Sequence, residues 1–493
     1  KDKNYIMLLD DVIRFNLDHV FSNFEYDFIE AFNIKLTRDA EIDIDNDISK
    51  SFVEKISKGL KDRKKGQPVR LVYDNTISPD LLDFIMKKIK FKKDDHPIPG
   101  GRYHNFKDFI SFPNIGNPEL SYKKIVPLKH PDLKDQPTLF KIIKKKGVLI
   151  TYPYQSFDHL IDLLREASID PCVKNVKITL YRVAKNSNIV KALINALKNG
   201  KEVTAVVELQ ARFDEESNIY WANKLQEEGA KVIYGVPGLK VHSKMFIISR
   251  KENNSLVKYA HIGTGNFNGD TAKIYTDHSL LTADKRITEE VEKVFAFYAD
   301  NLKTGSYDHL LVSPFFMRKE LVKLINTEIK NALNKKEAYI ILKLNNLVDV
   351  DMIKKLYEAS SKGVKIKMII RGTCSLVAGV KGMSDNIEAI SVIDKFLEHS
   401  RLFIFCNGGK EKYFLSSADW MTRNLDHRSE VAVPIYDKAI QQHLREIMDT
   451  LWSDNTKARV LGVKQNNEYR VLKNDIHVRA QEKIYNLLKP RKT

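Results

Sequence analysis

Cysteine is scarce in this sequence of 493 residues. The three cysteines, Cys172, Cys374 and Cys406, are odd in number and far apart, so they form neither a disulfide framework nor the paired spacing of a zinc site. The chain also has no run of the roughly 20 apolar residues that a membrane-spanning helix requires. These absences favour a reducing compartment and argue against a disulfide-stabilised secreted domain or an integral membrane protein.

A nucleotide-binding P-loop is absent as well. The two Gly-Lys pairs, at 200–201 and 409–410, are each followed by Glu rather than by Ser or Thr. No signal peptide is visible, but the sequence begins at Lys1 rather than methionine, which leaves an upstream leader open. If the protein handles nucleotide phosphates, residues other than a P-loop must bind them.

Basic residues outnumber acidic ones, with 81 Lys and Arg against 64 Asp and Glu and a net charge of +17. This charge predicts a polyanionic partner, such as a phosphate compound, a nucleic acid or an anionic membrane surface. A solvated basic surface without a partner is the plain alternative. Hydrophobic residues make up 43% of the chain, which is typical of a globular protein, and the length suits about three domains.

The most informative pattern is a strand-like segment that occurs twice. In residues 239–248, apolar side chains alternate with polar ones, which predicts a strand with His242 and Lys244 on one face. Residues 396–405 repeat the pattern with His399 and Arg401. Histidine and lysine are poor core residues, because each needs a polar partner if it is buried. The repeat therefore favours a functional role over a scaffold role for both histidines.

Polar residues downstream of the two segments also repeat. Asn266 follows the first segment after a glycine-rich turn, and Asp419 occupies the corresponding position after the second. Asp277 lies 11 residues after Asn266, and Glu430 lies 11 residues after Asp419. Asp277 and Glu430 are therefore candidates to hold the histidine of their own copy, with a surface ion pair as the alternative.

The same repeat organises the domains. Strand and helix patterns alternate from about residue 147, which predicts a mainly parallel sheet covered by helices. We expect an α/β protein (α+β overall) with a mostly helical α+β domain at 1–128. Two duplicated α/β domains follow at 129–309 and 310–493. A duplicated pair packs most simply with pseudo-two-fold symmetry, which would place both histidines across one cleft.

Two facing histidines suit phosphoryl transfer in two steps. One neutral imidazole attacks phosphorus, and the other handles the proton of the leaving or entering oxygen. A carboxylate on the far ring nitrogen would fix each tautomer, and Lys244, Arg401 and Asn266 would bind the phosphate oxygens. Arginines that follow predicted strands form a second group of phosphate-binding candidates, because ligands bind at the carboxyl ends of parallel strands: Arg182, Arg212 and Arg371.

These motifs identify a resemblance. The paired His-x-Lys/Arg units resemble the phospholipase D superfamily, and nearly the whole chain is similar to the long-chain bacterial polyphosphate kinases. The strings that carry the second resemblance are Gly-Gly-Arg-Tyr-His-Asn-Phe-Lys-Asp-Phe from 100, Thr-Leu-Tyr-Arg-Val-Ala from 179, Val-Glu-Leu-Gln-Ala-Arg-Phe-Asp-Glu from 207, His-Ile-Gly-Thr-Gly-Asn-Phe-Asn from 261, Leu-Lys-Leu-Asn-Asn-Leu-Val-Asp from 342 and Leu-Ser-Ser-Ala-Asp-Trp-Met-Thr-Arg-Asn from 415.

The resemblance implies roles for single residues. His242 matches the autophosphorylated histidine, and His399 matches the second catalytic histidine and a nucleotide contact. Tyr275 and Arg371 match further nucleotide contacts. Arg182 and Arg212 match positions assigned to magnesium. Because a guanidinium has no lone pair to give, we interpret both arginines as binding phosphate that itself carries Mg²⁺.

The resemblance also implies partners and a location. They are ATP or ADP, inorganic polyphosphate and further copies of the chain in a homodimer or larger homo-oligomer, with no nucleic acid. By the same resemblance, the domain at 1–128 would serve dimerisation or line a tunnel for the polymer. The expected location is cytoplasmic, with peripheral association at the inner membrane as an alternative. The family begins with a helical domain that supplies an asparagine contact to the nucleotide, and we expect this chain to lack it.

Two rival functions stay open at this point. In a phospholipase D-like phosphodiesterase, water or an alcohol would attack the phosphohistidine. A non-catalytic module that binds polyanions or nucleic acid would use the net charge of +17 and would need no duplicated histidine pair. Formation of ADP from ATP without a diester substrate would separate the kinase from both.

Overall fold

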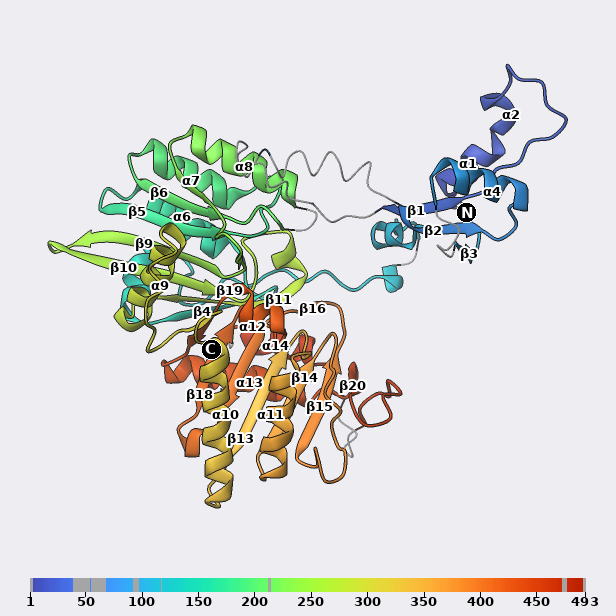
Figure 1. Ribbon diagram of the computed structural model, residues 1–493. Coiled ribbons are helices and arrows are strands. Elements are labelled where there is room, and N and C mark those ends of the chain that lie inside the picture. The colour runs from blue at the N-terminus through green and yellow to red at the C-terminus, as the bar shows by residue number, and fades with distance from the viewer. Residues whose placement is uncertain are drawn as a thin grey trace. The chain divides into compact units, whose positions relative to one another are not determined.

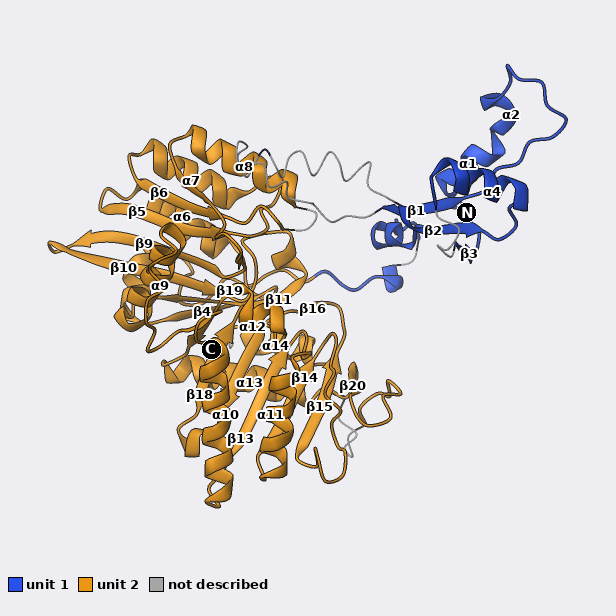
Figure 2. Cartoon of the chain, in the orientation of Figure 1, with its two compact units in different colours: residues 1–124 blue, residues 125–493 orange. Residues whose placement is uncertain are grey.

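The computed structural model describes residues 3–38, 54, 68–91, 97–116, 118–211, 214–471 and 477–490. The chain forms two compact units, residues 1–124 and residues 125–493 (Figure 2). Within the described ranges, no helix has the length and apolar character that a bilayer crossing requires.

The first unit combines short helices with a three-stranded sheet. β1 pairs antiparallel with β2, and β2 pairs parallel with β3. Ser78 begins α4, the longest helix among the described residues of this unit, and its side chain accepts a hydrogen bond from the Leu81 amide. The elements are α1 Leu9–Phe15, α2 Leu17–Val20, β1 Ile34–Arg38, β2 Pro68–Asp74, α4 Pro79–Lys88, β3 Ile98–Gly100 and the 3₁₀ turns Phe106–Ser111 and Pro118–Leu120.

The second unit contains two similar α/β halves, and the first half is built on an eight-stranded sheet (Figure 1). The alternation of strands and helices expected from about residue 147 is present, for example where strand β5 is followed by helix α7. The elements are α5 Leu139–Lys145, β4 Val148–Tyr152, α6 Asp158–Ile169, β5 Val173–Leu180, α7 Asn188–Lys198, β6 Glu202–Val207, α8 Glu215–Glu227, β7 Lys231–Tyr234, β8 Lys240–Val241, β9 Lys244–Glu252, β10 Ser255–Gly263, the 3₁₀ turn Thr271–Lys273, β11 Tyr275–Thr282 and α9 Lys285–Ala299.

The second half repeats this order around a nine-stranded sheet. Helices α10 and α11 pack against the sheet in the same sequence positions as α6 and α7 (Figure 1). The elements are β12 Leu311–Ser313, α10 Met317–Leu333, β13 Tyr339–Leu344, α11 Val350–Ser361, β14 Lys365–Ile370, β15 Ile387–Val392, β16 Leu397–Glu398, β17 Arg401–Phe405, the 3₁₀ turn Asn407–Gly409, β18 Lys412–Ser416, α12 Thr422–Asp426, β19 Arg428–Pro434, α13 Lys438–Trp452, β20 Ala458–Val460 and α14 Ala480–Leu488.

The sheets are mixed, so the prediction of a mainly parallel sheet is wrong. Strands β5, β6 and β7 run parallel, but β9, β10, β11 and β4 form antiparallel pairs. A tight hairpin joins β9 to β10 through Asn253 and Asn254, whose φ angles are 43° and 61°. Asparagine adopts this left-handed backbone more readily than most residues, and consecutive positive φ angles are typical of two-residue hairpins. The alternation of helices and strands along the chain therefore indicates parallel pairing correctly for only part of each sheet.

Each half lends one short strand to the sheet of the other. β8 pairs parallel with β19, in the register Lys240 with Arg428 and Val241 with Ser429. β16 pairs parallel with β11, in the register Leu397 with Tyr275 and Glu398 with Thr276. The segment before each histidine therefore belongs to the opposite half. The single strand expected at 239–248 is in fact two strands, β8 and β9, with His242 at the break between them.

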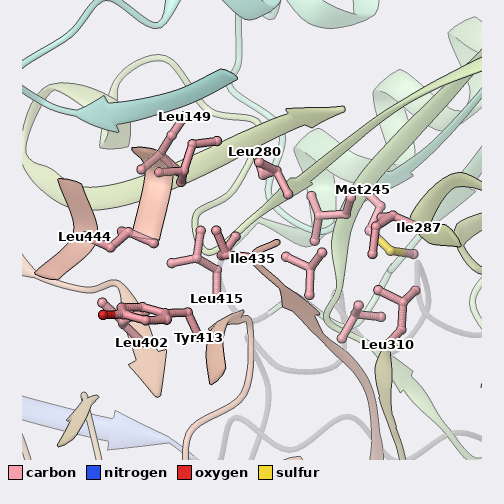
Figure 3. Close-up of a cluster of buried hydrophobic side chains, with 14 of the residues drawn as sticks. Leu149, Met245, Leu280, Ile287, Leu310, Leu402, Tyr413, Leu415, Ile435 and Leu444 are labelled. Carbon is pink, nitrogen blue, oxygen red and sulfur yellow. The ribbon is translucent and has the colours of Figure 1, made fainter. Parts of the chain in front are cut away.

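A shared hydrophobic core joins the two halves. Its buried side chains come from both sheets and from α9, α13 and α14 (Figure 3). Leu149, Met245 and Leu280 from the first half lie in the same cluster as Leu402 and Leu415 from the second. This core fixes the relative position of the two sheets, and with it the strands that carry the candidate site.

Candidate active site

The ring of His242 is hydrogen-bonded to a carboxylate from the other half. The parallel pairing of β8 with β19 places His242 one residue beyond the last paired position, beside Glu430. The His242 Nδ1 atom lies 2.8 Å from a Glu430 carboxylate oxygen, and the Glu430 side chain is fully buried. Ser417 and Asn424 donate hydrogen bonds of 2.5 and 2.6 Å to the same carboxylate. Hydrogen bonds from Ser417 and Asn424 therefore hold the Glu430 carboxylate in its orientation independently of the imidazole.

His399 is held in the same way. The pairing of β16 with β11 brings it to Asp277, whose two oxygens each lie 2.9 Å from the His399 Nδ1 atom. Thr264 donates a hydrogen bond of 2.6 Å to Asp277. The side chains of His242 and His399 stay 12% and 15% exposed, so a substrate can reach both rings.

The assignment of each carboxylate to its own copy is therefore corrected by the geometry. Asp277 holds His399, and Glu430 holds His242. The physical reason is the strand exchange, because β8 and β16 add to the opposite sheets and carry their histidines with them. Both halves are needed to build either histidine–carboxylate pair, which we call a dyad.

A glycine-rich turn allows the Asp277 carboxylate to sit where it does. A Cβ atom at Gly265 would lie 2.3 Å from the Asp277 Oδ2 atom, well inside contact distance. A Cβ atom at Gly263 would lie 2.8 Å from the His261 ring. The lack of a side chain at both glycines thus lets the backbone lie close to side chains of the protein itself.

Burial keeps both histidines neutral. It lowers the pKa of His242 to about 3, against the opposing effect of Glu430, and it lowers the pKa of His399 against the opposing effect of Asp277. Burial would raise the pKa of Asp277 and Glu430, but the facing histidines and donated hydrogen bonds keep both pKa values below the ordinary range. Each carboxylate is thus ionised and accepts the Nδ1–H bond, which leaves the Nε2 lone pair free.

Lys244 and Arg401 occupy equivalent positions but have different environments. Lys244 is buried, donates a hydrogen bond to the His242 carbonyl and has its Nζ atom 4.8 Å from the centre of the Tyr181 ring. Burial lowers its pKa well below the ordinary value. Arg401 pairs with Asp419 at 3.2 Å and lies 3.3 Å from the His399 Nε2 atom.

A protonated Lys244 lowers the pKa of both His242 and His399, after the larger effect of burial. Asn266, the third candidate phosphate ligand, has a buried Oδ1 atom that finds no hydrogen-bond partner among the described residues.

The remaining predicted contacts lie around His399 and at the strand ends. The Tyr275 ring centre is 5.1 Å from that of His399, and Arg371 donates to the Glu398 carbonyl at 2.9 Å. Arg182 forms an ion pair of 3.1 Å with Asp214, while Arg212 lies outside the described residues.

Four side chains at the site were not predicted from sequence: Tyr181, Thr264, Ser417 and Asn424. The Tyr181 ring packs edge-on against His242 with a centroid distance of 4.6 Å. Thr264 and Ser417, which donate to the two carboxylates, each lie two residues before a predicted site residue, Asn266 or Asp419. This shared hydroxyl position is a repeat signal that could have identified both.

The described residues do not fit a resident metal centre. No group of three or more His, Cys, Asp or Glu side chains gathers in those parts of the chain at metal-binding distance. Arg182 has no lone pair to offer a cation.

Comparison with known proteins matches the whole chain to one family. Residues 1–112 match the polyphosphate kinase middle domain, 138–304 match polyphosphate kinase C-terminal domain 1 and 310–481 match C-terminal domain 2. The polyphosphate kinases of Vibrio parahaemolyticus and Escherichia coli K12 are each 48% identical, over 99% and 98% of this chain and 70% and 71% of their own lengths. The crystal structure of the Porphyromonas gingivalis polyphosphate kinase superposes with a TM-score of 0.83 at 35% identity, covering 97% of this chain and 70% of that one.

Proposed function

The chain belongs to the polyphosphate kinase family and is an enzyme, and we propose that it transfers the γ-phosphate of ATP reversibly to the end of an inorganic polyphosphate chain. The observation that carries the proposal for the mechanism is the pair of histidine–carboxylate dyads, in which the Nδ1 atoms of His242 and His399 are each held by a carboxylate and the Nε2 atoms remain unprotonated, that of His399 lying 3.3 Å from Arg401. The transfer would pass through a phosphohistidine at His242.

In the first step, the neutral His242 Nε2 atom attacks the γ-phosphorus. The new N–P bond forms as the bond from phosphorus to the bridging oxygen breaks, and ADP leaves with the electron pair. The Nδ1–H bond to Glu430 stabilises the positive charge that develops on the imidazole. Lys244 and Arg401 supply positive charge near the phosphoryl oxygens.

In the second step, a terminal oxygen of polyphosphate attacks the phosphorus and the N–P bond breaks. This returns His242 to its neutral form and lengthens the polymer by one phosphate. His399 acts as the acid or base for the oxygen that leaves or enters, and Asp277 stabilises its protonated form. Because both steps use the same groups, the transfer can run in either direction.

The proposal extends to the substrates' counter-ion and to the surroundings of the enzyme. Mg²⁺ would enter bound to the nucleotide phosphates, with Arg182 and Arg371 contacting those phosphates and Tyr275 contacting the nucleotide. We further propose assembly as a homodimer or larger homo-oligomer in the cytoplasm, with peripheral contact to the inner membrane. The net charge of +17 supports the binding of a phosphate polymer.

The direct test is to detect phosphohistidine after incubation with ATP labelled at the γ-phosphate. We expect acid-labile label on His242 in the wild type and none in His242→Ala. Release of ADP without any diester substrate, together with lengthening of polyphosphate, completes the assignment. Label that persists on His242→Ala would contradict it.

A further inference from the structure

A buried tyrosine hydroxyl ties together the two segments that form the His242–Glu430 dyad. Tyr298, on α9, has its hydroxyl 2.8 Å from the Ser243 Oγ atom and 2.6 Å from the Ser429 Oγ atom. Ser243 directly follows His242, and Ser429 directly precedes Glu430. All three hydroxyl-bearing side chains are buried.

The two serines belong to opposite halves, so this contact spans the strand exchange. The Ser429 carbonyl also accepts hydrogen bonds from the backbone of His242, at 2.9 Å, and of Ser243, at 3.0 Å. Sliding β8 along β19 would break these bonds and both contacts of Tyr298 at once. The hydroxyl therefore opposes the motion that would separate the His242 Nδ1 atom from Glu430.

The corresponding place in the other dyad holds a different group. Lys343 donates to Ser400, the residue after His399, at 2.8 Å, and it forms a buried ion pair of 3.0 Å with Glu398. Thr276, the residue before Asp277, donates to Glu398 at 2.9 Å. The strand exchange at His399 is thus fixed by an ion pair, whereas the exchange at His242 is fixed by a neutral phenol.

We propose that Tyr298 is a positioning residue for the His242–Glu430 dyad, and that Thr276 with the Lys343–Glu398 pair is the positioning group for the His399–Asp277 dyad. This inference deepens the proposed phosphohistidine mechanism and rests on it. Neither group contacts the Nε2 atom of either histidine, so each acts through the strand register. An error of about 1 Å in that register can cost on the order of 10²-fold in rate, because in-line attack depends on orientation.

Two isosteric substitutions test the two groups separately. Tyr298→Phe removes both serine contacts and keeps the ring, and Thr276→Val removes the hydroxyl and keeps the shape. Tyr154→Phe is the matched control, since Tyr154 is equally buried and its hydroxyl has no hydrogen-bond partner among the described residues. Circular dichroism and thermal unfolding would confirm that each variant folds. If Tyr298→Phe does not fold, Ser429→Ala replaces it in the test, because it removes one of the two Tyr298 contacts.

The rate of His242 phosphorylation gives the first readout. Tyr298→Phe should slow it roughly tenfold, the scale expected when hydrogen bonds that orient a reacting group are lost. The slowing should be equal with ATP and with a phosphoryl donor whose leaving group has a low pKa. Thr276→Val should slow the reaction with ATP but much less with the low-pKa donor, which needs little help from His399. Tyr154→Phe should match the wild type with both donors.

A readout without activity uses protein labelled with ¹⁵N in histidine. Tyr298→Phe should shift the ring signals of His242 and leave those of His399 in place, and Thr276→Val should do the reverse. If Tyr298→Phe matches Tyr154→Phe in rate and in spectrum, or if both substitutions disturb both dyads equally, the inference is wrong. If the wild type itself forms no phosphohistidine, the proposed function fails, while the spectra still decide which group positions which histidine.

Discussion

At the residue scale, the exchange of carboxylates gives each acidic residue a distinct chemical task. Glu430 accepts from the proposed nucleophile His242, and Asp277 accepts from the proposed acid–base His399. The amide group of Asn or Gln in place of either carboxylate can donate a hydrogen bond to an unprotonated Nδ1 atom and so stabilise the wrong tautomer. The same substitution should therefore impair a different step in each half.

The first prediction compares Glu430→Gln with Asp277→Asn. Glu430→Gln should slow phosphorylation of His242 on the order of 10²–10⁴-fold with every donor, because the Nε2 lone pair of the nucleophile is lost. Asp277→Asn should slow it with ATP and recover much of the rate with a donor whose leaving group has a low pKa. The labelling rate with the two donors measures both effects. If the low-pKa donor instead rescued Glu430→Gln and not Asp277→Asn, the assignment of Glu430 to His242 and of Asp277 to His399 would be wrong.

The second prediction concerns the protonation of His242. Burial lowers its pKa from 6.5 to about 3, so the neutral form should persist as the pH falls from 7 to 5. A titration of ¹⁵N-histidine signals should show the Nδ1-protonated neutral tautomer of His242 at pH 5. The same protein in denaturant should titrate near 6.5. A folded-state midpoint above pH 6 would show that burial does not control this group.

At the element scale, the glycine-rich turn packs closely against a side chain of the strand that follows it. The backbone at Gly265 lies against the carboxylate of Asp277 on β11, and Thr264 beside it donates to the same group. The turn thus shapes one dyad without contributing a reacting atom.

Gly265→Ala is the third prediction. Its Cβ atom would lie 2.3 Å from the Asp277 Oδ2 atom, so the carboxylate must move away from His399. We expect phosphorylation with ATP to slow by on the order of 10²-fold, the usual cost of displacing a catalytic group by about 1 Å. Gly116→Ala, where no atom lies within 4 Å of the new Cβ, should leave the rate unchanged and serves as the control. A normal rate in Gly265→Ala would show that the turn can shift to accommodate the new Cβ atom without displacing Asp277 from His399.

Much of the fold and of the site could be predicted at this scale, because the duplication shows each signal twice. The strands β5 and β13, the helices that follow them and the His399 counterpart of His242 are all marked by repeated spacing. The strand exchange could not be predicted. β8 and β16 are two residues long, and their hydrogen bonds with the opposite sheets leave no periodic pattern. Tyr181 was missed because the position after β5 differs in the second half, where Asn345 follows β13.

At the scale of the whole second unit, several histidines are buried in the neutral form. Burial lowers the pKa of His130 to about 4 and the pKa values of His261 and His278 to about 3. In the unfolded chain, each would titrate near 6.5. Between these limits the unfolded state binds more protons than the folded state, so acid favours unfolding.

The last prediction is therefore a loss of stability with falling pH. Above about pH 6.5 all three histidines are neutral in both states and contribute no pH dependence. As the pH falls from 6.5 toward 4, each adds up to about 1.4 kcal/mol of destabilisation per pH unit, because unfolding takes up one further proton. Urea unfolding of the folded chain at pH 7, 6 and 5 should show a progressively smaller free energy of unfolding. His278→Asn should reduce the slope of the unfolding free energy against pH by an amount that corresponds to about one proton. The substitution removes one buried titrating group and keeps a polar side chain beside Thr151. A free energy that stays constant from pH 7 to 5, or an unchanged slope in a folded His278→Asn protein, would show that these rings reach solvent protons before the chain unfolds.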